Sequence, residues 1–298
     1  IIMALPSYAT PIQRSYYYAY IFICGVVFFF LIAPLVAIIP ISFSQSPFMV
    51  FTEGMMAWPP DPEAWSLRWY RYMVGICTDE NLTTPCSNKW MIGTVNSFFV
   101  GFVSTFFATA LGTLAALGLS RPHMPYKGLI MSILISPMIV PLIITAAGMF
   151  FFYAKINLVY TFTGIILAHI ALSTPFVVIT VTATLVGFDM NMVKASQSLG
   201  ARPTRTFFKV IMPLILPGVI SGALFAFITS FDEVVIVMFM ASLDQLTIPK
   251  QMWAGIRQEI SPVILCMATC LVALSIFLLT TVELLRRRSE KMRGITSR

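Results

Sequence analysis

Two adjacent carboxylates stand in one of the most apolar parts of the sequence, in the run Ser230-Phe231-Asp232-Glu233. One acid at mid-bilayer costs about 2.5–3.5 kcal/mol, so two acids at membrane depth require a polar partner or an aqueous path. Acidic side chains that border a path attract a cation, and the ring of Phe231 offers it a cation–π face. Alternatively, one or both acids are protonated or accept hydrogen bonds from neighbouring backbone. These four residues are the candidates for a cation pathway.

Other reactive groups in the sequence are sparse. The two histidines, His123 and His169, have no cysteine or carboxylate at ligand spacing, so no zinc pattern exists and no Ser-His-Asp arrangement can be assembled. A Gly-rich phosphate loop ending in Gly-Lys-Ser or Gly-Lys-Thr is also absent from the sequence. The sequence therefore predicts a protein without catalytic residues, metal site or cofactor of its own.

The five cysteines divide into two groups by position. Cys77 and Cys86 lie in a long polar loop with turn-forming residues between them, and an oxidising compartment permits a disulfide there that closes a loop of roughly ten residues. Cys24, Cys266 and Cys270 fall in apolar stretches, where we expect them to pack as small apolar side chains.

The candidate residues must be positioned by membrane-spanning helices. The chain of 298 residues is 58% hydrophobic and 10% charged, against roughly 25% charged residues in ordinary soluble domains. Six apolar stretches reach the roughly 20 residues that a spanning helix needs, and the first, which is long and has no cleavage site, is expected to be retained. They are 20–43, 91–119, 128–153, 163–187, 210–241 and 262–285. The predicted fold class is an all-α polytopic membrane protein with one transmembrane domain over residues 20–285.

Orientation follows from the basic residues, of which 13 of 19 fall on one side of the six predicted spans. They are Arg14, Arg121, Lys127, Lys194, Arg202, Arg205, Lys209, Arg286, Arg287, Arg288, Lys291, Arg293 and Arg298. The positive-inside bias places this side, with the segment 1–19 and the basic tail 286–298, in the cytoplasm. Because the charges lie at helix ends and not on a soluble face, the net charge of +7 indicates anionic membrane lipid as a partner, and not nucleic acid.

An external loop is predicted at about residues 45–90. Asp61 and Pro62 form a good helix start, so a short external helix is expected over 64–73. Pro137, Pro141 and Pro175 predict kinks in the third and fourth spans. Small residues repeat at steps of three and four along the second span, which predicts close helix packing there.

A hairpin of two short helices is predicted in the cytoplasmic loop at about residues 188–209. Asp189 can cap a helix that runs to Leu199, Gly200 suits the left-handed position that ends a helix, and Pro203 can open the next. Its partly apolar face would be either a protein-docking site or a surface resting against lipid headgroups. The residues of that face are Met190, Val193, Gln197 and Phe207.

The same loop resembles the EAA loop of permease subunits of binding-protein-dependent ATP-driven importers. The resemblance rests on Lys194-Ala195-Ser196, Gly200-Ala201, Phe207, Val210, Pro213 and Pro217-Gly218. It implies the type I ABC importer permease fold and a coupling helix that docks on an ATPase subunit. The residues implied in coupling are Asp189, Lys194, Ala195, Ser196, Gly200, Ala201 and Phe207. Lys194 departs from the family pattern, which usually has Glu there.

The resemblance also implies partners and a bacterial inner-membrane location. The expected partners are two ABC ATPase subunits that bind ATP and Mg, a second homologous permease subunit and a periplasmic solute-binding protein. The motif 230–235 and the run 251–262 are similar to the spermidine/putrescine branch, which implies a polyamine or related amine as solute. Amino-acid derivatives and opines remain alternatives within the family. A secondary transporter that couples to an ion through Asp232 and Glu233 is the alternative outside it.

Overall fold

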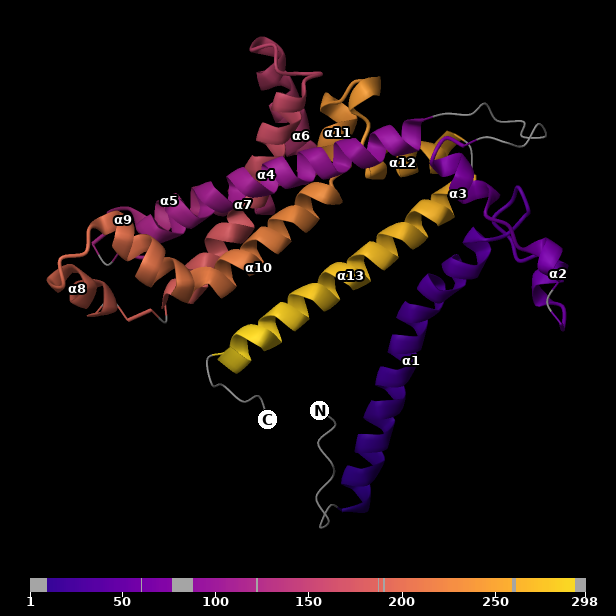
Figure 1. Cartoon of the computed structure of the whole chain (residues 1–298), viewed down its shortest axis with the longest axis horizontal. Helices are drawn as coiled ribbons and strands as arrows, with labels where there is room; N and C mark the ends of the chain where they lie inside the picture. The colour runs from indigo at the N-terminus through magenta and orange to yellow at the C-terminus, as the bar shows by residue number, and fades with distance from the viewer. Residues whose placement is uncertain are drawn as a thin grey trace. The chain divides into compact units, whose positions relative to one another are not determined.

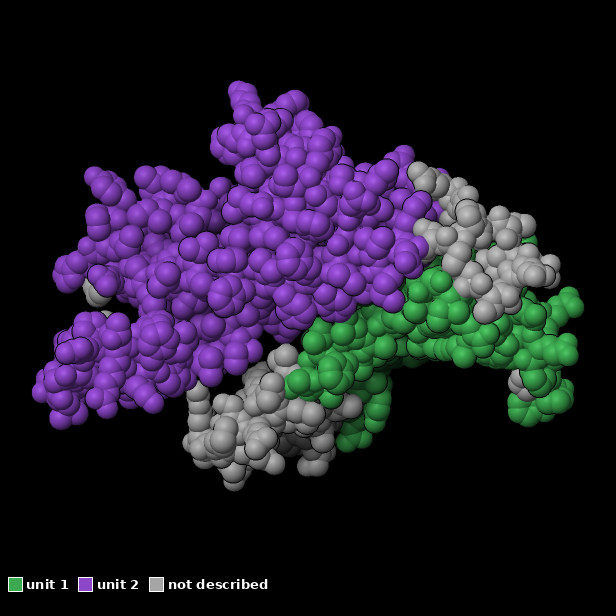
Figure 2. Space-filling view, turned by 45° about the horizontal axis from the view of Figure 1, so that its top comes forward, with its two compact units in different colours: residues 1–86, 259–298 green, residues 87–258 purple. Residues whose placement is uncertain are grey.

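The structure, a computed structural model, is built from helices (Figure 1). It describes residues 10–59, 61–76, 88–121, 123–186, 188–189, 191–258 and 261–292, with side chains described as far as Thr281, apart from Gln258. The chain forms two compact units (Figure 2). The first comprises residues 1–86 and 259–298, and the second comprises residues 87–258.

Five helical segments of the described residues are long and apolar enough to cross a membrane, and a bent pair of helices makes a sixth when counted as one. The five are α1 (Pro11–Ser42), α4 (Lys89–Leu119), α7 (Phe162–Val186), the run Pro203–Phe231 and the part Val263–Thr281 of α13 (Val263–Met292). The prediction of an all-α polytopic membrane protein is confirmed.

The bent pair lies where a single third span is predicted. α5 (Lys127–Ile139) and α6 (Leu142–Lys155) meet at 103°. Pro141 has no N–H for the helical ladder, and the residue before it, Val140, takes the extended conformation that a following proline favours. The predicted kink is therefore in the right place, and the bend of 103° divides the predicted third span into two separate helices.

The predicted fifth span, 210–241, is also wrong at both ends. Its helix begins earlier, because α9 (Pro203–Thr206) and a π-helical stretch (Phe207–Ile211) lead without a break into α10 (Met212–Phe231). It ends earlier because a separate short helix, α11 (Val235–Met240), follows Phe231. Glu233 accounts for this break, since its carboxylate Oε1 accepts a hydrogen bond from the backbone N–H of Ile236 at 2.8 Å and so starts the new helix.

In the first unit, the segment after α1 holds three short elements: α2 (Glu53–Met56), the 3₁₀ turn η1 (Pro62–Ala64) and α3 (Arg68–Met73). Asp61 caps η1 by accepting from the N–H of Glu63 at 3.0 Å, as predicted. The single helix predicted over 64–73 is wrong, because Trp65 is extended and pairs with Ser44 in an antiparallel bridge.

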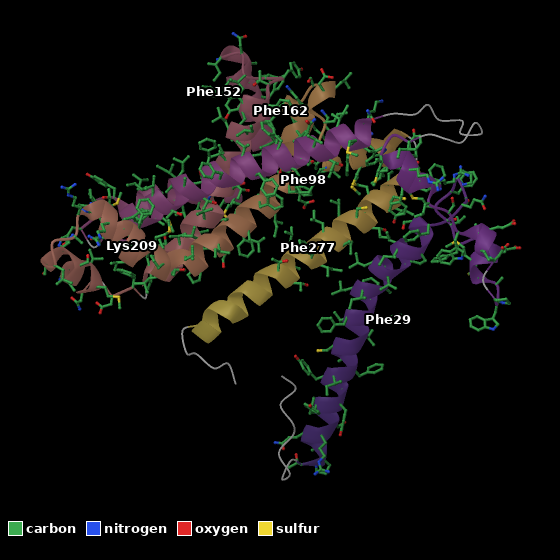
Figure 3. The ribbon with its side chains drawn as sticks, in the orientation of Figure 1. Phe29, Phe98, Phe152, Phe162, Lys209 and Phe277 are labelled. Atoms are coloured by element: carbon green, nitrogen blue, oxygen red, sulfur yellow. The ribbon has the colours of Figure 1, made fainter. Side chains whose placement is uncertain are left out.

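α1 packs along α13 in this unit, and most of its long apolar surface is exposed, as for Phe29 (Figure 3). A helix hydrophobic on nearly all sides is suited to lipid contact. Its last residue, Ser42, shares a hydrogen bond of 2.7 Å with the phenol of Tyr70, and its carbonyl accepts from the thiol of Cys266. Cys24, Cys266 and Cys270 are free thiols, whereas Cys77 and Cys86 lie outside the described residues.

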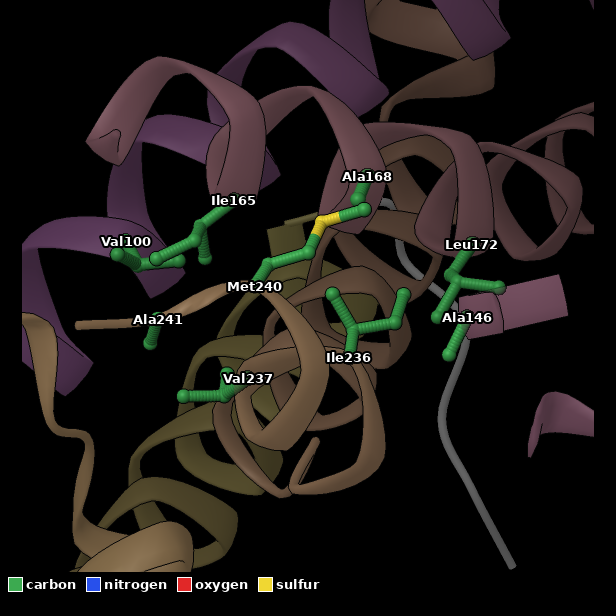
Figure 4. Packing of buried hydrophobic residues seen from close by; sticks show 9 residues of the cluster. All are labelled: Val100, Ala146, Ile165, Ala168, Leu172, Ile236, Val237, Met240 and Ala241. Atoms are coloured by element: carbon green, nitrogen blue, oxygen red, sulfur yellow. The ribbon is translucent and has the colours of Figure 1, made fainter. Parts of the chain in front are cut away.

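In the second unit, α4, α7 and α10 pack against one another. The small residues of α4 make this possible: a Cβ added at Gly112 would lie 2.6 Å from the Cβ of Val177 on α7. An apolar cluster of buried side chains joins α11 to α4, α6 and α7 (Figure 4). It comprises Val100, Ala146, Ile165, Ala168, Leu172, Ile236, Val237, Met240 and Ala241. The unit is completed by α8 (Asn191–Ser198), the 3₁₀ turn η3 (Leu243–Gln245) and α12 (Ile248–Gln258).

Candidate functional site

The predicted cytoplasmic loop folds as a pair of short helices, α8 and α9, which we call the α8–α9 hairpin (residues 189–206). Asp189 caps α8, since its Oδ1 accepts from the N–H of Asn191 at 2.9 Å. Pro203 occupies the first turn of α9, where its missing N–H costs nothing. Local residue types therefore fix both helix starts where the sequence predicts them.

The turn of the α8–α9 hairpin depends on Gly200. Its φ of +77° lies in the left-handed region, which costs an L-residue with a side chain roughly 1–2 kcal/mol. The N–H groups of Gly200 and Ala201 then donate to the carbonyls of Gln197 and Ser196 at 2.9 and 3.1 Å. These bonds satisfy the last carbonyls of α8, so a glycine at this position closes the hairpin tightly.

A side-chain hydrogen bond ties the two helices together across the turn. The hydroxyls of Ser196 and Thr206 lie 2.9 Å apart, and Thr206 is buried. Ser196, a residue of the resemblance to the EAA loop, thus has a structural partner within the hairpin. Lys194 and Ala195 on the same helix are exposed.

A pocket of about 790 Å³ lies beneath the α8–α9 hairpin. Val193, Gln197 and Phe207, three of the four residues predicted for a docking face, contribute to its lining together with the connection 117–125. Val193 and Phe207 are half-buried and Gln197 is exposed, whereas Met190, the fourth, lies outside the described residues. Among the described residues of the hairpin, the large apolar side chains exposed to the surroundings are those of Met192 and Leu199, the latter 88% exposed.

The four residues of the predicted cation pathway stand at the other end of α10, where they separate into different environments. Glu233 is only 7% exposed, and its carboxylate caps α11. Asp232 is exposed, and its carboxylate has no hydrogen bond or ion pair with the described residues. Ser230 is buried and lies 2.7 Å from Nδ1 of the buried His169 on α7. Of the two acids, Asp232 alone has a carboxylate free for another partner.

These residues stand at the C-terminal end of the long helical run Pro203–Phe231, which begins in the α8–α9 hairpin. Asp232 follows directly at the C-cap of α10. The acids therefore lie at the end of the span opposite the α8–α9 hairpin.

The segment from Asp232 to Gln258, which we call the α11–α12 segment, is held by long-range hydrogen bonds from α4. The side-chain amide of Asn96 donates to the carbonyls of Asp244 and Leu246, both at 2.9 Å. The hydroxyl of Ser97 accepts from the N–H of Ile248 at 2.8 Å. Two adjacent polar residues on one spanning helix thus fix the chain about 150 residues later.

Further bonds hold the two ends of α11. The ammonium of Lys250 donates to the carbonyls of Val237 and Ala241 at 3.2 and 3.0 Å, which satisfies the C-terminal end of the helix. Glu233 and Lys250 thus place opposite charges at the two ends of α11, in the sense that the helix dipole favours. Partial burial lowers the pKa of the Lys250 ammonium.

Sequence reasoning did not assign these roles to His169 or Lys250. A histidine within an apolar span was a signal that a polar partner is required, and Ser230 on α10 supplies it. Lys250 offered no signal in the sequence, because its partners are backbone carbonyls in another element.

Comparison with known protein families identifies the family of this chain. Residues 108–291 match the family of binding-protein-dependent transport system inner membrane components. The chain belongs to this family. The match includes the α8–α9 hairpin and the α11–α12 segment, so both are parts of the region that the family shares.

Relatives in this family cover nearly the whole chain. The spermidine/putrescine transport system permease protein PotC of Shigella flexneri is 26% identical over 268 residues, which cover 90% of this chain and 94% of that protein. The putrescine transport system permease protein PotI of Escherichia coli (strain K12) is 26% identical over 267 residues, which cover 87% of this chain and 86% of that protein.

Solved structures show the same fold. A chain of a bacterial ABC transporter involved in the import of the acidic polysaccharide alginate superposes with a TM-score of 0.66 at 14% identity, covering 95% of this chain and 99% of that chain. The inward-facing MetNI methionine ABC transporter matches with a TM-score of 0.50 at 19% identity, covering 71% of this chain and 100% of that chain.

Membership of the family fixes the general role of the chain. It is a multi-pass permease subunit of the inner membrane that works within an ABC transporter complex. ATP hydrolysis belongs to separate ATPase subunits, and the permease subunit is not an enzyme and carries no cofactor of its own.

Proposed function

We propose that the chain forms one half of the pathway of an ABC importer for a small organic amine, in the polyamine class. The α8–α9 hairpin carries this proposal, because its local bonds make it a rigid projection with Met192 and Leu199 exposed. An exposed apolar pair flanked by Lys194 and Arg202 is suited to docking on a protein. The partner at this surface is the ATPase.

The complete complex contains this chain, a second homologous permease subunit, two ATPase subunits that bind ATP and Mg, and a periplasmic solute-binding protein. Residues 20–285 form its transmembrane domain, and the segments 1–19 and 286–298 lie in the cytoplasm, on the side favoured by 13 of the 19 basic residues. Closure of the ATPases carries the α8–α9 hairpin with it, and α10 transmits this movement because Pro203–Phe231 is one continuous helical run.

The amine assignment is supported by two observations of different kinds. The relatives PotC and PotI are permease proteins of a spermidine/putrescine and a putrescine transport system. Independently, Asp232 presents a carboxylate without a hydrogen bond or ion pair to any described residue at the end of the span opposite the α8–α9 hairpin, and such a carboxylate attracts a cation.

Reconstitution tests the proposal. The chain is co-expressed with the products of neighbouring genes, purified as a complex and placed in liposomes, and the uptake of radiolabelled putrescine is measured with and without internal ATP and binding protein. We expect uptake only when both are present. Ion-driven uptake by this chain alone would overturn the proposal in favour of a secondary transporter. ATP-driven uptake of an amino-acid derivative or an opine without amine uptake would overturn the amine assignment alone.

A further inference from the structure

Four phenylalanine rings from two spanning helices form a closed cycle of contacts, and Asp232 follows one of them, Phe231, in the chain. α4 supplies Phe98 and Phe102, and α10 supplies Phe227 and Phe231. The ring centroids are separated by 5.9 Å (98–102), 5.1 Å (102–227), 5.3 Å (227–231) and 5.2 Å (231–98). We call this group the phenylalanine tetrad; Figure 3 labels Phe98 between the ribbons of α4 and α10.

The phenylalanine tetrad rests directly on the backbone of α4. A Cβ added at Gly101 would lie 3.1 Å from Cε2 of Phe227 and 3.7 Å from Cδ2 of Phe231. Phe227 is buried at this base, Phe98 and Phe231 are half-buried, and Phe102 is 61% exposed. The tetrad is thus anchored on one side and presents ring surface on the other.

The charge of Asp232 distinguishes the surface of the tetrad from aromatic packing that faces only lipid. Asp232 follows Phe231 directly at the C-cap of α10, is exposed, and has no hydrogen bond or ion pair with the described residues. The neighbouring Glu233 has its carboxylate occupied at the start of α11. The aromatic cluster is therefore followed in the chain by an exposed carboxylate that no described residue neutralises.

Aromatic faces together with one carboxylate have the chemistry that an alkylammonium ion requires. The ring faces attract the cation and cover its methylene groups, while the carboxylate balances its charge. An anion would be repelled by both the ring faces and the acid, and a neutral polyol would find few hydrogen-bonding groups. The tetrad together with Asp232 would therefore select a solute by its positive charge as well as by its shape.

We propose that the phenylalanine tetrad and Asp232 form a receiving site for a primary or secondary alkylammonium group at the end of the span opposite the α8–α9 hairpin. This inference rests on the proposed function and deepens it. It adds Phe98 and Phe102 to the residues that contact the solute, with Phe227 as the buried base beneath them, and it assigns Asp232, and not Glu233, to the solute's charge.

Fluorinated phenylalanine provides the test, because fluorine weakens the negative face of the ring while preserving its shape. The full complex in lipid nanodiscs, without binding protein, is titrated with radiolabelled putrescine, and 1,4-butanediol serves as the neutral competitor. Position 231 carries phenylalanine or 3,4,5-trifluorophenylalanine. Phe225, an exposed α10 residue that stacks on Phe176 at 6.4 Å outside the tetrad, receives the same substitution as a matched control.

We expect trifluorophenylalanine at position 231 to weaken putrescine binding by about 3- to 10-fold, within the range that cation–π contacts produce. Asp232→Asn should weaken it comparably, Glu233→Gln should have a smaller effect on binding, and the change at Phe225 should have none. Butanediol should not compete.

Three results would overturn the inference. Equal losses at positions 231 and 225 would show a general effect of fluorination. Unchanged binding at position 231, in a complex that imports putrescine, would remove the tetrad from the pathway and leave the proposed function standing. Absence of amine import by the unaltered complex would overturn the proposed function and this inference together.

Discussion

The α8–α9 hairpin and the α11–α12 segment stand at the two ends of α10 and differ in what fixes their backbone. The hairpin is defined by bonds between residues at most ten positions apart, such as those of Asp189 with Asn191 and of Ser196 with Thr206. The α11–α12 segment is held by side chains about 150 residues away on α4. A partner can therefore displace the first as one piece, whereas the second moves only with the helices that hold it.

The largest effect is expected from breaking the long-range bonds of the α11–α12 segment. Asn96→Leu removes both bonds of the amide and leaves the carbonyls of Asp244 and Leu246 without it. Since an unsatisfied buried acceptor costs about 1–3 kcal/mol, we expect a loss of about 2–3 kcal/mol in the free energy of unfolding. Thermal unfolding of the purified complex measures the loss, and hydrogen exchange over residues 243–250 locates it.

Asn88→Leu is the matched control for this change, because Asn88 is exposed at the start of α4 and its side chain makes no capping bond. Equal stability of the two variants would mean that the α11–α12 segment is not held by α4, and the contrast between the two ends of α10 would be lost.

The second effect concerns the turn of the α8–α9 hairpin. Gly200→Val forces a β-branched residue to a φ of +77°, which costs about 1–2 kcal/mol. We expect ATP-driven uptake to fall while ATP hydrolysis by the complex persists, because the turn that orients α8 is distorted. Gly200→Asn, which tolerates the left-handed region better, should retain most of the uptake. Full uptake by the valine variant at normal expression would exclude this turn from coupling.

The third effect concerns the end of α11. Lys250→Met keeps the apolar stem of the side chain but removes its bonds to the carbonyls of Val237 and Ala241. We expect about 1 kcal/mol of destabilisation, measured by thermal unfolding. Lys127→Met, at an exposed position on α5, should change stability little. A greater loss from the Lys127 change would contradict a capping role for Lys250.

The smallest effect is expected within the α8–α9 hairpin. Ser196→Ala removes the hydroxyl that bonds Thr206 across the turn at 2.9 Å, and we expect a loss of about 0.5–1 kcal/mol. Ser198→Ala removes a hydroxyl that bonds only the carbonyl of Lys194 within α8. A double-mutant cycle of Ser196→Ala with Thr206→Val measures the bond, and a coupling energy near zero would show that it does not brace the hairpin.

The difference between local and long-range hydrogen bonds also explains which features could be predicted from the sequence. Asp189, Gly200 and Pro203 act through the conformations of their own backbone neighbourhood, so residue types at the right spacing were sufficient. The break after Phe231 could not be predicted in this way, because the apolar sequence resumes after Asp232 and Glu233 and continues through Met240. It depends on the carboxylate of Glu233, which accepts a hydrogen bond from the N–H of Ile236.

Proline gave partial information about the third span. Pro137 and Pro141 predict that the helical ladder is interrupted, and the interruption occurs between Ile139 and Leu142. The angle of 103° is not encoded by the prolines, since packing of α6 on α11 decides where the second half goes. Within the predicted cation pathway, residue types could identify the acids, but only the structure shows that Glu233 is occupied and that three further rings accompany Phe231.

The pocket of about 790 Å³ beneath the α8–α9 hairpin has a mechanical consequence. Closely packed protein interiors have low compressibility, so a displacement on one side is transmitted to the other side. A hairpin above an open volume can instead move as one piece before it meets the bundle, so the first part of any inward stroke narrows the pocket. The remainder reaches the bundle along the chain itself, through the π-helical turns of Phe207–Ile211 that continue into α10. The side chains that line the pocket therefore set how much of the stroke arrives at the far end of the span.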